Sequence, residues 1–525
     1  KVKREKSFYC AEFVKYVLEE SKICSLPEII KPEDFKNIKA NKNYILMNDL
    51  DFNNQIITPI GTRNNPYTGI FDGNGYTISG NNTARIFNVT DNAVLSLSNV
   101  TLIEGNATNG GAVYVNAGST LNANTVGFDN NTAMYRGGAI YSEGTVNIDD
   151  SSFDSNNITY RKKNVDYGGA AIANMGGTLN VDRSRFTNDL RNYVVRAGDS
   201  KNPQLIDGVI LNVGNAKINN SYFENNSGTY GGAISSLPVN GFASETSLTV
   251  ENCKFINNLA YCGAGIYVSA DLGKHAHFSI DNCTFIGNNA TGIGSYGYSS
   301  AGGAIALVYV ADGNITNSKF YNNTATIGGA VDASTPGSNY IINVTIDNCD
   351  FENNTAVGSS NREAIGGAIR LIGDGMTVAV KDSNFTDNVA DNGSAIYNTG
   401  LLSLSGNKVF SDEAEIVNGK KGIISSSINV IVLDGEVKTI DTLKANLNAN
   451  VTDDNGNLIE DAKFNFTINE VEVPAVYNAS SKLYEASYTL PVAGIYPVNI
   501  TYVKDDELVV KNATIISIKG TYTDL

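Results

Sequence analysis

The chain has 525 residues, a formal net charge of −16 and a pI of about 4.7. Nucleic acid is not expected as a partner, because the field of an acidic chain repels phosphate groups. Six cysteines are too few for a disulfide framework at this length, and the sequence has no run of about 18 apolar residues that would predict a membrane span. The length allows roughly two to four domains.

Residues 1–33 precede the repeats and carry apolar residues at helical spacing: Phe13, Val14, Val17 and Leu18. We predict a short helix that caps the open end of a stacked structure, because solenoids need such caps. Segment 8–14 (FYCAEFV) resembles the nucleophile helix of permuted papain-like cysteine hydrolases, in which Cys10 would have a lowered pKa. In that family the histidine lies upstream of the cysteine, whereas both histidines here lie far downstream. The segment is interpreted as a cap or as the remnant of a hydrolase domain.

Residues 34–90 alternate short apolar runs with turn residues, which predicts strands. Segment 67–78 (YTGIFDGNGYTI) resembles the opening of many secreted β-helix proteins. Asp49, Asp51 and Asp72 carry the oxygen ligands that calcium prefers. Turn chemistry explains these three residues more simply, because aspartate hydrogen-bonds to the backbone of turns.

A two-part motif then recurs, a Gly-Gly-Ala-Ile segment followed by a strand and by Ser-x-Phe-x-x-Asn. Its phenylalanines lie 25 to 37 residues apart, at Phe128, Phe153, Phe186, Phe223, Phe255, Phe285, Phe320, Phe351 and Phe385. Repeats of this period indicate a solenoid, and their short apolar runs lack helical periodicity. We therefore predict that each repeat is one coil of a parallel β-helix of about 12 coils.

Equivalent residues of successive coils would stack about 4.8 Å apart, so each motif position predicts a column. The phenylalanines would fill the interior, and the Gly pairs would form tight corners. The asparagine three residues after each Phe, replaced once by Asp189, is expected to adopt left-handed backbone angles and to exchange amide hydrogen bonds. Ser or Cys occupies the position two residues before most of these phenylalanines. Cys253 and Cys283 fall on neighbouring coils, where a disulfide is compatible with the repeat but not required by it.

The paired motifs resemble the repeats of chlamydial polymorphic membrane proteins and of adhesin-like surface proteins of methanogenic archaea, over residues 34–421. This resemblance implies a right-handed parallel β-helix of the pectate-lyase-like type, an extracellular cell-surface location and a role in adhesion. It implies no catalytic residues, no metal and no cofactor. About 20 Asn-x-Ser/Thr sequons are consistent with a secreted glycoprotein, although an Asn- and Thr-rich β-helix also produces them by chance.

Four repeats carry insertions between the Phe and the next Gly pair, where the usual spacing of 8 or 9 residues grows to 15, 22, 17 and 15. Loops on one edge of a rigid solenoid are the default place for binding. The first two insertions are basic and are candidates for binding an anionic polysaccharide or a sialylated glycan, through Arg161, Lys162, Lys163, Arg191, Arg196 and Lys201. The third contains Tyr296 and Tyr298, which can stack on sugar rings. The alternatives are a charged edge that deters strand pairing and, for the third insertion, flexible filler.

Residues 422–525 lack the Gly-Gly-Ala-Ile motif and contain strand-like runs at regular spacing, which predicts an antiparallel β-sandwich. Asp453-Asp454-Asn455-Gly456-Asn457 is a hairpin signal. The segments VTDDNGNLIEDAKFNFTI and GIYPVNITY resemble bacterial Ig-like repeats of surface proteins, which implies a spacer.

We therefore predict a non-enzymatic, monomeric, adhesin-like protein whose partners are polysaccharides or cell-surface glycans and the cell envelope. The alternative is a β-helix polysaccharide lyase or glycoside hydrolase, which would need an Asp cluster, often with Arg or Lys, on one face. Asp149 and Asp150 are adjacent in sequence, but no such cluster is apparent at matching positions of adjacent repeats. A third interpretation is an envelope protein without a ligand. His275 and His277 share one side of a strand, which is a poor metal site without carboxylates or thiols nearby.

Overall fold

The computed structural model describes residues 28–30, 41–51, 58–159, 167–189, 206–291, 300–309, 311–360, 362–410, 416–426, 429–433, 437–452, 458–504 and 507–517. This part of the chain is all-β and contains no helix. The helix predicted within residues 1–33, and Cys10 with it, lies outside the described residues.

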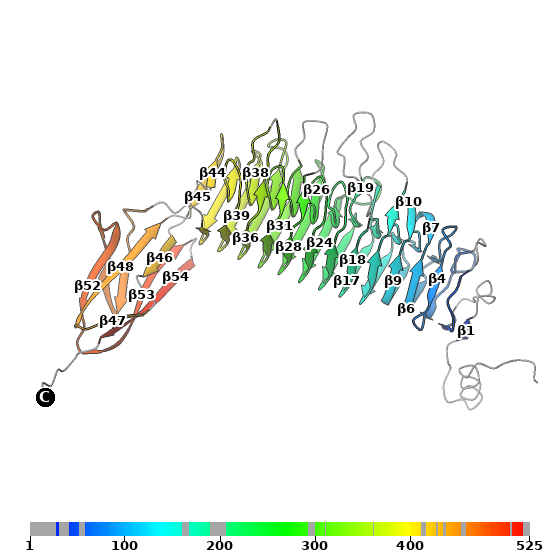
Figure 1. Cartoon of the computed structure of the whole chain (residues 1–525), viewed down its shortest axis with the longest axis horizontal. Coiled ribbons are helices and arrows are strands. Elements are labelled where there is room, and N and C mark those ends of the chain that lie inside the picture. The colour runs from blue at the N-terminus through cyan, green and yellow to red at the C-terminus, as the bar shows by residue number, and fades with distance from the viewer. Residues whose placement is uncertain are drawn as a thin grey trace, which may run out of the picture.

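Stacked parallel strands form a parallel β-helix between β1 and β45, as predicted (Figure 1). One side is a 25-stranded sheet, called the long sheet, and another is a twelve-stranded sheet, in agreement with the expected number of coils. Two short sheets of five and three strands lie between them along the chain. In the long sheet of most coils, a longer strand and a three-residue strand follow one another, as β12 and β13 do.

The strands of the long sheet are β1 (Glu28–Ile30), β2 (Tyr44–Leu46), β3 (Gly69–Asp72), β4 (Thr77–Ser79), β6 (Val94–Ile103), β9 (Thr120–Asp129), β12 (Thr145–Asp149), β13 (Ser152–Asp154), β17 (Thr178–Asp182), β18 (Arg185–Thr187), β21 (Asn215–Asn219), β22 (Tyr222–Glu224), β24 (Glu245–Glu251), β25 (Lys254–Ile256), β27 (His275–Asp281), β28 (Thr284–Ile286), β31 (Ala311–Thr316), β32 (Lys319–Tyr321), β35 (Ile342–Asp347), β36 (Asp350–Glu352), β39 (Met376–Lys381), β40 (Asn384–Thr386), β42 (Leu401–Ser405), β43 (Lys408–Phe410) and β45 (Ile423–Ser426).

The twelve-stranded sheet contains β5 (Phe87–Val89), β8 (Val113–Val115), β11 (Ile140–Ser142), β16 (Ile172–Asn174), β20 (Ile210–Asn212), β23 (Ile234–Ser236), β26 (Ile266–Ala270), β30 (Ile305–Tyr309), β34 (Val331–Ser334), β38 (Ile369–Ile372), β41 (Ile396–Asn398) and β44 (Ile416–Asn418). The short sheets contain β7 (Asn106–Asn109), β10 (Thr132–Arg136), β14 (Asn157–Ile158), β15 (Tyr167–Gly168) and β19 (Ile206–Asp207), and then β29 (Asn289–Ala290), β33 (Thr324–Ala325) and β37 (Thr355–Ala356).

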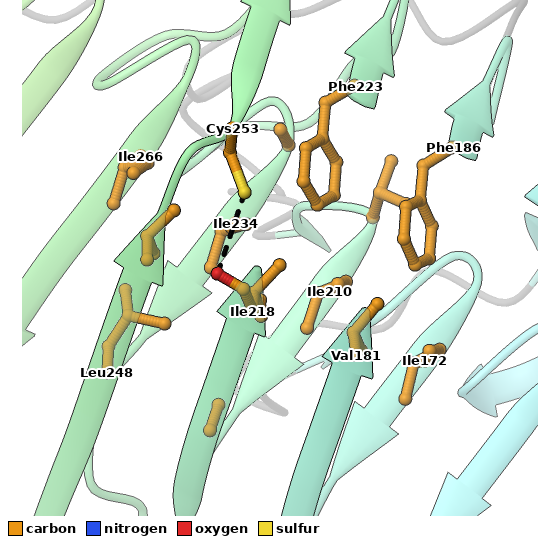
Figure 2. Close-up of a cluster of buried hydrophobic side chains, with 14 of the residues drawn as sticks. Ile172, Val181, Phe186, Ile210, Ile218, Phe223, Ile234, Leu248, Cys253 and Ile266 are labelled. Atoms are coloured by element: carbon orange, nitrogen blue, oxygen red, sulfur yellow. Dashed lines mark hydrogen bonds between the residues drawn. The ribbon is translucent and has the colours of Figure 1, made fainter. Parts of the chain in front are cut away.

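The predicted phenylalanine column is confirmed. Each Phe from Phe128 to Phe351 pairs in register with the Phe of the next coil, and the column ends at Phe385. Ring centroids lie 4.6 Å apart between Phe128 and Phe153 and 5.0 Å apart between Phe351 and Phe385, with nearly parallel planes. Figure 2 shows two of these rings beside the aliphatic side chains of the two large sheets. Full burial of each ring contributes about 1.5–3 kcal/mol, so the column stabilises the stack along its length.

The predicted asparagine column also forms, and its members are buried. Asn258 is typical, because its Oδ1 accepts the backbone N–H of Asn226 at 3.1 Å and its Nδ2 donates to Asn288 Oδ1 at 2.9 Å. Its Nδ2 also donates to the carbonyl of Phe223 at 3.1 Å. The amides therefore link each coil to both of its neighbours.

The prediction that these asparagines adopt left-handed angles was wrong by one residue. The positive φ belongs to the preceding residue, for example 52° at Asn257 and 55° at Asn322. The chain turns at that position, and the turn points the following asparagine into the interior, where it meets its ladder partners. At the Gly pairs the first glycine does have a positive φ, as at Gly137 (63°), where a Cβ would lie 2.1 Å from the carbonyl oxygen of Ile140.

The Ser/Cys column forms a second hydrogen-bonded ladder. The backbone N–H of Ser184 donates to Ser221 Oγ at 3.1 Å, and that of Ser221 donates to Cys253 Sγ at 3.4 Å. The Cys253 thiol donates to the carbonyl oxygen of Ile218 at 3.5 Å (Figure 2). Cys253 and Cys283 are both free thiols, so the disulfide that the repeat would permit does not form.

A second hydrophobic core lies within residues 429–517, between two sheets. One sheet contains β46 (Asn429–Leu433), β48 (Lys444–Thr452), β51 (Val476–Asn478) and β52 (Leu483–Thr489). The other contains β47 (Val437–Ile440), β49 (Asn465–Ile468), β50 (Val471–Pro474), β53 (Gly494–Lys504) and β54 (Glu507–Ser517). Leu447 and Tyr484 of the first sheet share a core with Phe466 and Val498 of the second, so the region is a β-sandwich.

The sandwich is not wholly antiparallel as predicted, because β47 pairs with β54 in parallel. The resemblance of this domain to Ig-like repeats stays a prediction. The hairpin signal at residues 453–457 lies outside the described residues.

Candidate ligand-binding site

The predicted glycan-binding residues all lie outside the described residues: Arg161, Lys162, Lys163, Arg191, Arg196, Lys201, Tyr296 and Tyr298. The strands that flank the first two insertions are described. Tyr167 at the end of the first insertion is in register with Ile206 at the end of the second, on neighbouring coils. Both insertions therefore rejoin the stack in the same short sheet, on the edge that leads to the twelve-stranded sheet.

The structure corrects one sequence inference on the outer face of the long sheet. Asp149 and Asp182 are in register on adjacent coils, and Arg183 forms ion pairs with both and with Asp150. The prediction that no Asp cluster occurs at matching positions of adjacent repeats was therefore wrong, and Asp149 and Asp150 are more than neighbours in sequence. The signal was present in the repeat, because Asp149 and Asp182 each lie four residues before a column Phe.

This cluster borders a groove of about 490 Å³, called the polar groove, which is lined by Asn122, Ala123, Asn124, Asn147, Ile148, Asp149, Asn180, Val181, Asp182, Lys217 and Asn219. Its amides are engaged with one another, since Asn147 Nδ2 donates to Asn122 Oδ1 and Asn180 Nδ2 donates to Asn147 Oδ1, both at 2.8 Å. The three carboxylates of the cluster share one guanidinium group. The amides of Asn122, Asn147 and Asn180 and the carboxylates of the cluster thus have partners within the described chain, whereas Asn219 Oδ1 is buried there without a hydrogen-bond partner.

A second groove of about 420 Å³ lies over the outer face of the twelve-stranded sheet and is called the tyrosine groove. It is lined by Tyr230, Tyr261, Cys262, Tyr267, Ala301, Val308, Tyr309, Ile327, Asp332, Ser334, Thr335, Pro336, Arg362 and Arg370. Ligand pockets commonly occupy about 300–1,000 Å³ and combine apolar walls with a few polar groups. This groove has both features.

The groove exists because outward-facing columns change residue size from coil to coil. The residue that follows each Gly-Gly-Ala-Ile segment faces outward, and successive coils place Tyr267, Ala306, Asp332 and Arg370 there in register. Beside it, isolated bridges pair Tyr230 with Cys262, Cys262 with Ala301 and Ala301 with Ile327. Small residues between large ones leave a hollow with an aromatic wall and a charged wall.

The charged wall is an ion pair between neighbouring coils. Arg370 Nε donates to Asp332 Oδ1 at 2.5 Å, and Ser334 Oγ donates to Asp332 Oδ2 at 3.2 Å. The side chains of Arg370 and Asp332 are only 10% and 1% exposed. The glycine corners make room for the pair, because a Cβ at Gly366 would lie 2.8 Å from the Cβ of Arg370.

The aromatic wall contains a backbone outlier. Tyr309 has a φ of 68°, which is uncommon for a large side chain, and such strain clusters at binding sites. Tyr309 is 37% exposed as a residue, and its ring centroid lies 5.5 Å from that of Tyr340, which packs against the core. Burial raises the pKa of the nearby Cys262 thiol to about 12, which favours the neutral thiol over the reactive thiolate at neutral pH.

The residues weighed as metal ligands have other partners. Asp72 Oδ1 accepts the backbone N–H of Asn74 at 2.9 Å, two residues later, which is the predicted turn chemistry. Asp49 Oδ1 accepts the backbone N–H of Thr77 at 2.8 Å, 28 residues later in the chain, so this bond links two coils and is not a turn. The assumption that His277 lacks a nearby carboxylate was wrong, because its Nδ1 lies 2.8 Å from Asp312 Oδ2. Within the described ranges, no three His, Cys, Asp or Glu side chains are grouped to hold a metal ion.

Comparisons with known proteins address the repeats. Residues 128–143, from the first column Phe through the first full Gly-Gly-Ala-Ile segment, match the Chlamydia polymorphic membrane protein repeat. The chain is 35% identical over 120 residues to the metabotropic glutamate receptor-like protein R of Dictyostelium discoideum. That match covers 23% of this chain and 6% of the relative. No solved structure matches the chain.

The chain thus carries repeats of the polymorphic-membrane-protein type, which supports the predicted resemblance for the β-helix. None of the helices that a membrane span would require occurs in the described part of the chain.

Proposed function

We propose that the chain is an adhesin-like cell-surface protein whose β-helix binds saccharides in the tyrosine groove without cleaving them. The observation that carries this proposal is the groove itself, which is lined both by an exposed tyrosine with strained backbone angles and by a buried Arg–Asp pair. The polymorphic-membrane-protein repeat supports the surface location, because that family consists of surface proteins.

Aromatic faces suit sugars because they present a broad apolar surface to the C–H groups of a sugar ring, with a hydroxyl at the edge for hydrogen bonding. Two tyrosines with few rotatable bonds lose little entropy when they bind. The strands that carry the groove are paired in register from coil to coil, and a rigid scaffold reduces the cost of ordering the site.

In this proposal the insertions extend the binding surface beyond the groove, and the β-sandwich has a separate role. The third insertion rejoins the described chain at Ser300, next to Ala301, which lines the groove. Tyr296 and Tyr298 would extend the aromatic wall, and the basic insertions would bind neighbouring acidic sugars. The β-sandwich would act as an Ig-like spacer between the β-helix and the cell envelope.

The test is binding of neutral and acidic oligosaccharides to the full chain, measured by calorimetry together with the release of new sugar ends. One stacking ring contributes about 0.5–1.5 kcal/mol to the binding free energy, so Tyr309→Ala should weaken binding by about 2- to 13-fold. The control is Tyr222→Ala, because this partly exposed tyrosine lies on β22 of the long sheet. Equal effects of both substitutions, or no binding at all, would contradict the proposal.

A second candidate function is glycan cleavage at the polar groove, because Asp149, Asp182 and Arg183 form an Asp cluster with an arginine on one face of the β-helix, which is the feature expected of a carbohydrate-active enzyme of this fold. New sugar ends that disappear in Asp149→Asn and Asp182→Asn, but persist in Tyr309→Ala, would favour this function. Saturable binding without the release of new sugar ends favours the adhesin-like function over cleavage.

A further inference from the structure

Arg370 presents an unused binding edge to the tyrosine groove. Among the contacts of the described chain, its guanidinium group is held through Nε by Asp332 alone. The terminal nitrogens Nη1 and Nη2 therefore have hydrogen atoms to donate to a ligand, although the side chain is nine-tenths buried. Neither terminal nitrogen is among the buried side-chain atoms of the described chain that lack a partner, so both are accessible from the groove that Arg370 lines, where a ligand can accept their hydrogen bonds.

The geometry of the ion pair favours a negatively charged ligand. Asp332 is almost completely buried and its second oxygen accepts a hydrogen bond from Ser334, so its charge is directed away from solvent. The charged residues of the groove lining are Arg362, Arg370 and Asp332, two positive and one negative. The groove is thus locally positive in a chain with a net charge of −16.

We infer that the tyrosine groove selects a sugar that carries an oxyanion, and that Arg370 binds the oxyanion through its two terminal nitrogens. The inference rests on the saccharide binding proposed above. A planar guanidinium donates two parallel hydrogen bonds to a carboxylate, as in a uronic or sialic acid, and also matches a tetrahedral oxyanion such as a sulfate ester. Asp332 acts as the positioning residue, because it holds Nε and so fixes the plane of the fork.

The experiment compares three related probes on the full chain: oligogalacturonate, its carboxyl-reduced neutral form, and a sulfated version of that neutral form. Hydrogen bonds to charged groups contribute enough to give roughly a 10- to 100-fold preference for a charged probe over the neutral one. Preference for oligogalacturonate identifies a carboxylate, and preference for the sulfated probe identifies a sulfate ester.

Two variants place the effect at Arg370. Arg370→Lys keeps the charge but loses the fork, and should lower the ratio of charged-probe to neutral-probe affinity at least about tenfold. The double variant Asp332→Asn/Arg370→Gln removes both charges, so that no unpaired carboxylate remains in the interior if the single variant folds poorly. Arg185→Lys is the matched control, because Arg185 lies on β18 of the long sheet and pairs with Glu224.

Equal binding of all three probes by the native chain, with loss of binding in Tyr309→Ala, would overturn the inference and leave the proposed saccharide binding intact. A preference that survives in both Arg370 variants would also overturn it. Absence of binding to every probe would refute the proposed function and the inference together.

Discussion

The inward columns of the β-helix and the outward column that forms the tyrosine groove obey different rules. Inside, the same residue recurs from coil to coil, as Phe255, Phe285 and Phe320 do. Outside, Tyr267 is followed by Ala306 and then by Asp332. Interior side chains stack on, or hydrogen-bond to, the equivalent side chain of the next coil, so a substitution there disturbs the neighbouring coil as well. Outward side chains have no such requirement, and the groove occurs where repetition is broken.

The largest effect is expected from opening the phenylalanine column. Phe255→Ala removes a ring stacked on both sides, at 4.9 Å from Phe223 and 4.7 Å from Phe285, and should destabilise the β-helix by about 3–5 kcal/mol. Urea unfolding followed by circular dichroism measures it. Ile256→Ala changes the next residue, which is not buried, and should cost much less; equal losses would show that the column is not special.

The next largest effect is expected in the asparagine ladder. Asn258→Ala leaves the backbone N–H of Asn226 and the carbonyl of Phe223 without their partners, and each orphaned buried group costs about 1–3 kcal/mol. We expect a loss of about 2–4 kcal/mol in the same unfolding experiment. Asn180→Ala, in the exposed ladder of the polar groove, is the control, because water replaces the lost amide. A comparable loss there would contradict the account.

Asp189 tests whether the ladder needs an amide at every coil. Its Oδ1 accepts from the backbone N–H of Asn156, but its Oδ2 is buried and has no partner in the described chain. In the preceding coil, Asn156 occupies the same ladder position, and its Nδ2 donates to the carbonyl of Phe128. By analogy, a protonated Asp189 Oδ2 would donate to the carbonyl of Phe153. Burial raises the pKa of Asp189 well above its usual value, and the nearby carboxylates of Asp154 and Asp129 raise it further.

Because the folded pKa exceeds the unfolded value of about 3.9, the stability contributed by this carboxyl is full below that pH and is lost as pH rises through the folded pKa. Asp189→Asn should abolish this loss and gain about 1 kcal/mol at pH 8, because an amide keeps its donor at every pH. Asp129, whose pKa burial and Asp154 raise to about 6, contributes a slope of the same sign that remains in the variant. The measurement is the unfolding midpoint of the native chain and of Asp189→Asn at pH 5 and at pH 8. If the difference between the two pH values is the same in both proteins, the role assigned to the Asp189 carboxyl is contradicted.

The smallest effect is expected in the Ser/Cys column. Cys283→Ser should change stability by less than about 1 kcal/mol, because serine fills the same position in the next coil and Ser318 Oγ accepts the backbone N–H of Cys283. A hydrogen bond with the neighbouring Cys253 thiol, together with burial, raises the pKa of the Cys283 thiol, so it should also resist alkylation in the folded protein. Rapid alkylation under native conditions, or a large loss of stability, would contradict this.

The sequence predicts the interior well because each column repeats a side chain whose bonding needs are visible in one coil. The left-handed position was placed one residue late because Asn257 and Asn258 are both asparagines, and only the stacked structure shows which one turns the chain and which one enters the ladder. The Asp149–Asp182–Arg183 cluster was missed although alignment on the phenylalanines puts both carboxylates in register.

The tyrosine groove was harder to predict from sequence because its residues follow the Gly-Gly-Ala-Ile segment singly and differ in every coil. The signal was the residue directly after each segment, where Asp332 and Arg370 break an otherwise uncharged run in neighbouring coils. The hollow itself depends on the size of Ala301 and Ala306 relative to the adjacent side chains, which is a property of the stack and not of one repeat.

The most direct test compares two double variants for binding of oligogalacturonate by the full chain. Tyr309→Ala/Arg370→Lys alters the tyrosine groove, whereas Tyr222→Ala/Arg185→Lys alters the same two residue types on the long sheet, where Arg185 lies 4.9 Å from the Tyr222 ring. Loss of binding only in the first variant is the predicted result. Equal binding by both variants and the native chain would show that the groove is not where this protein meets its ligand.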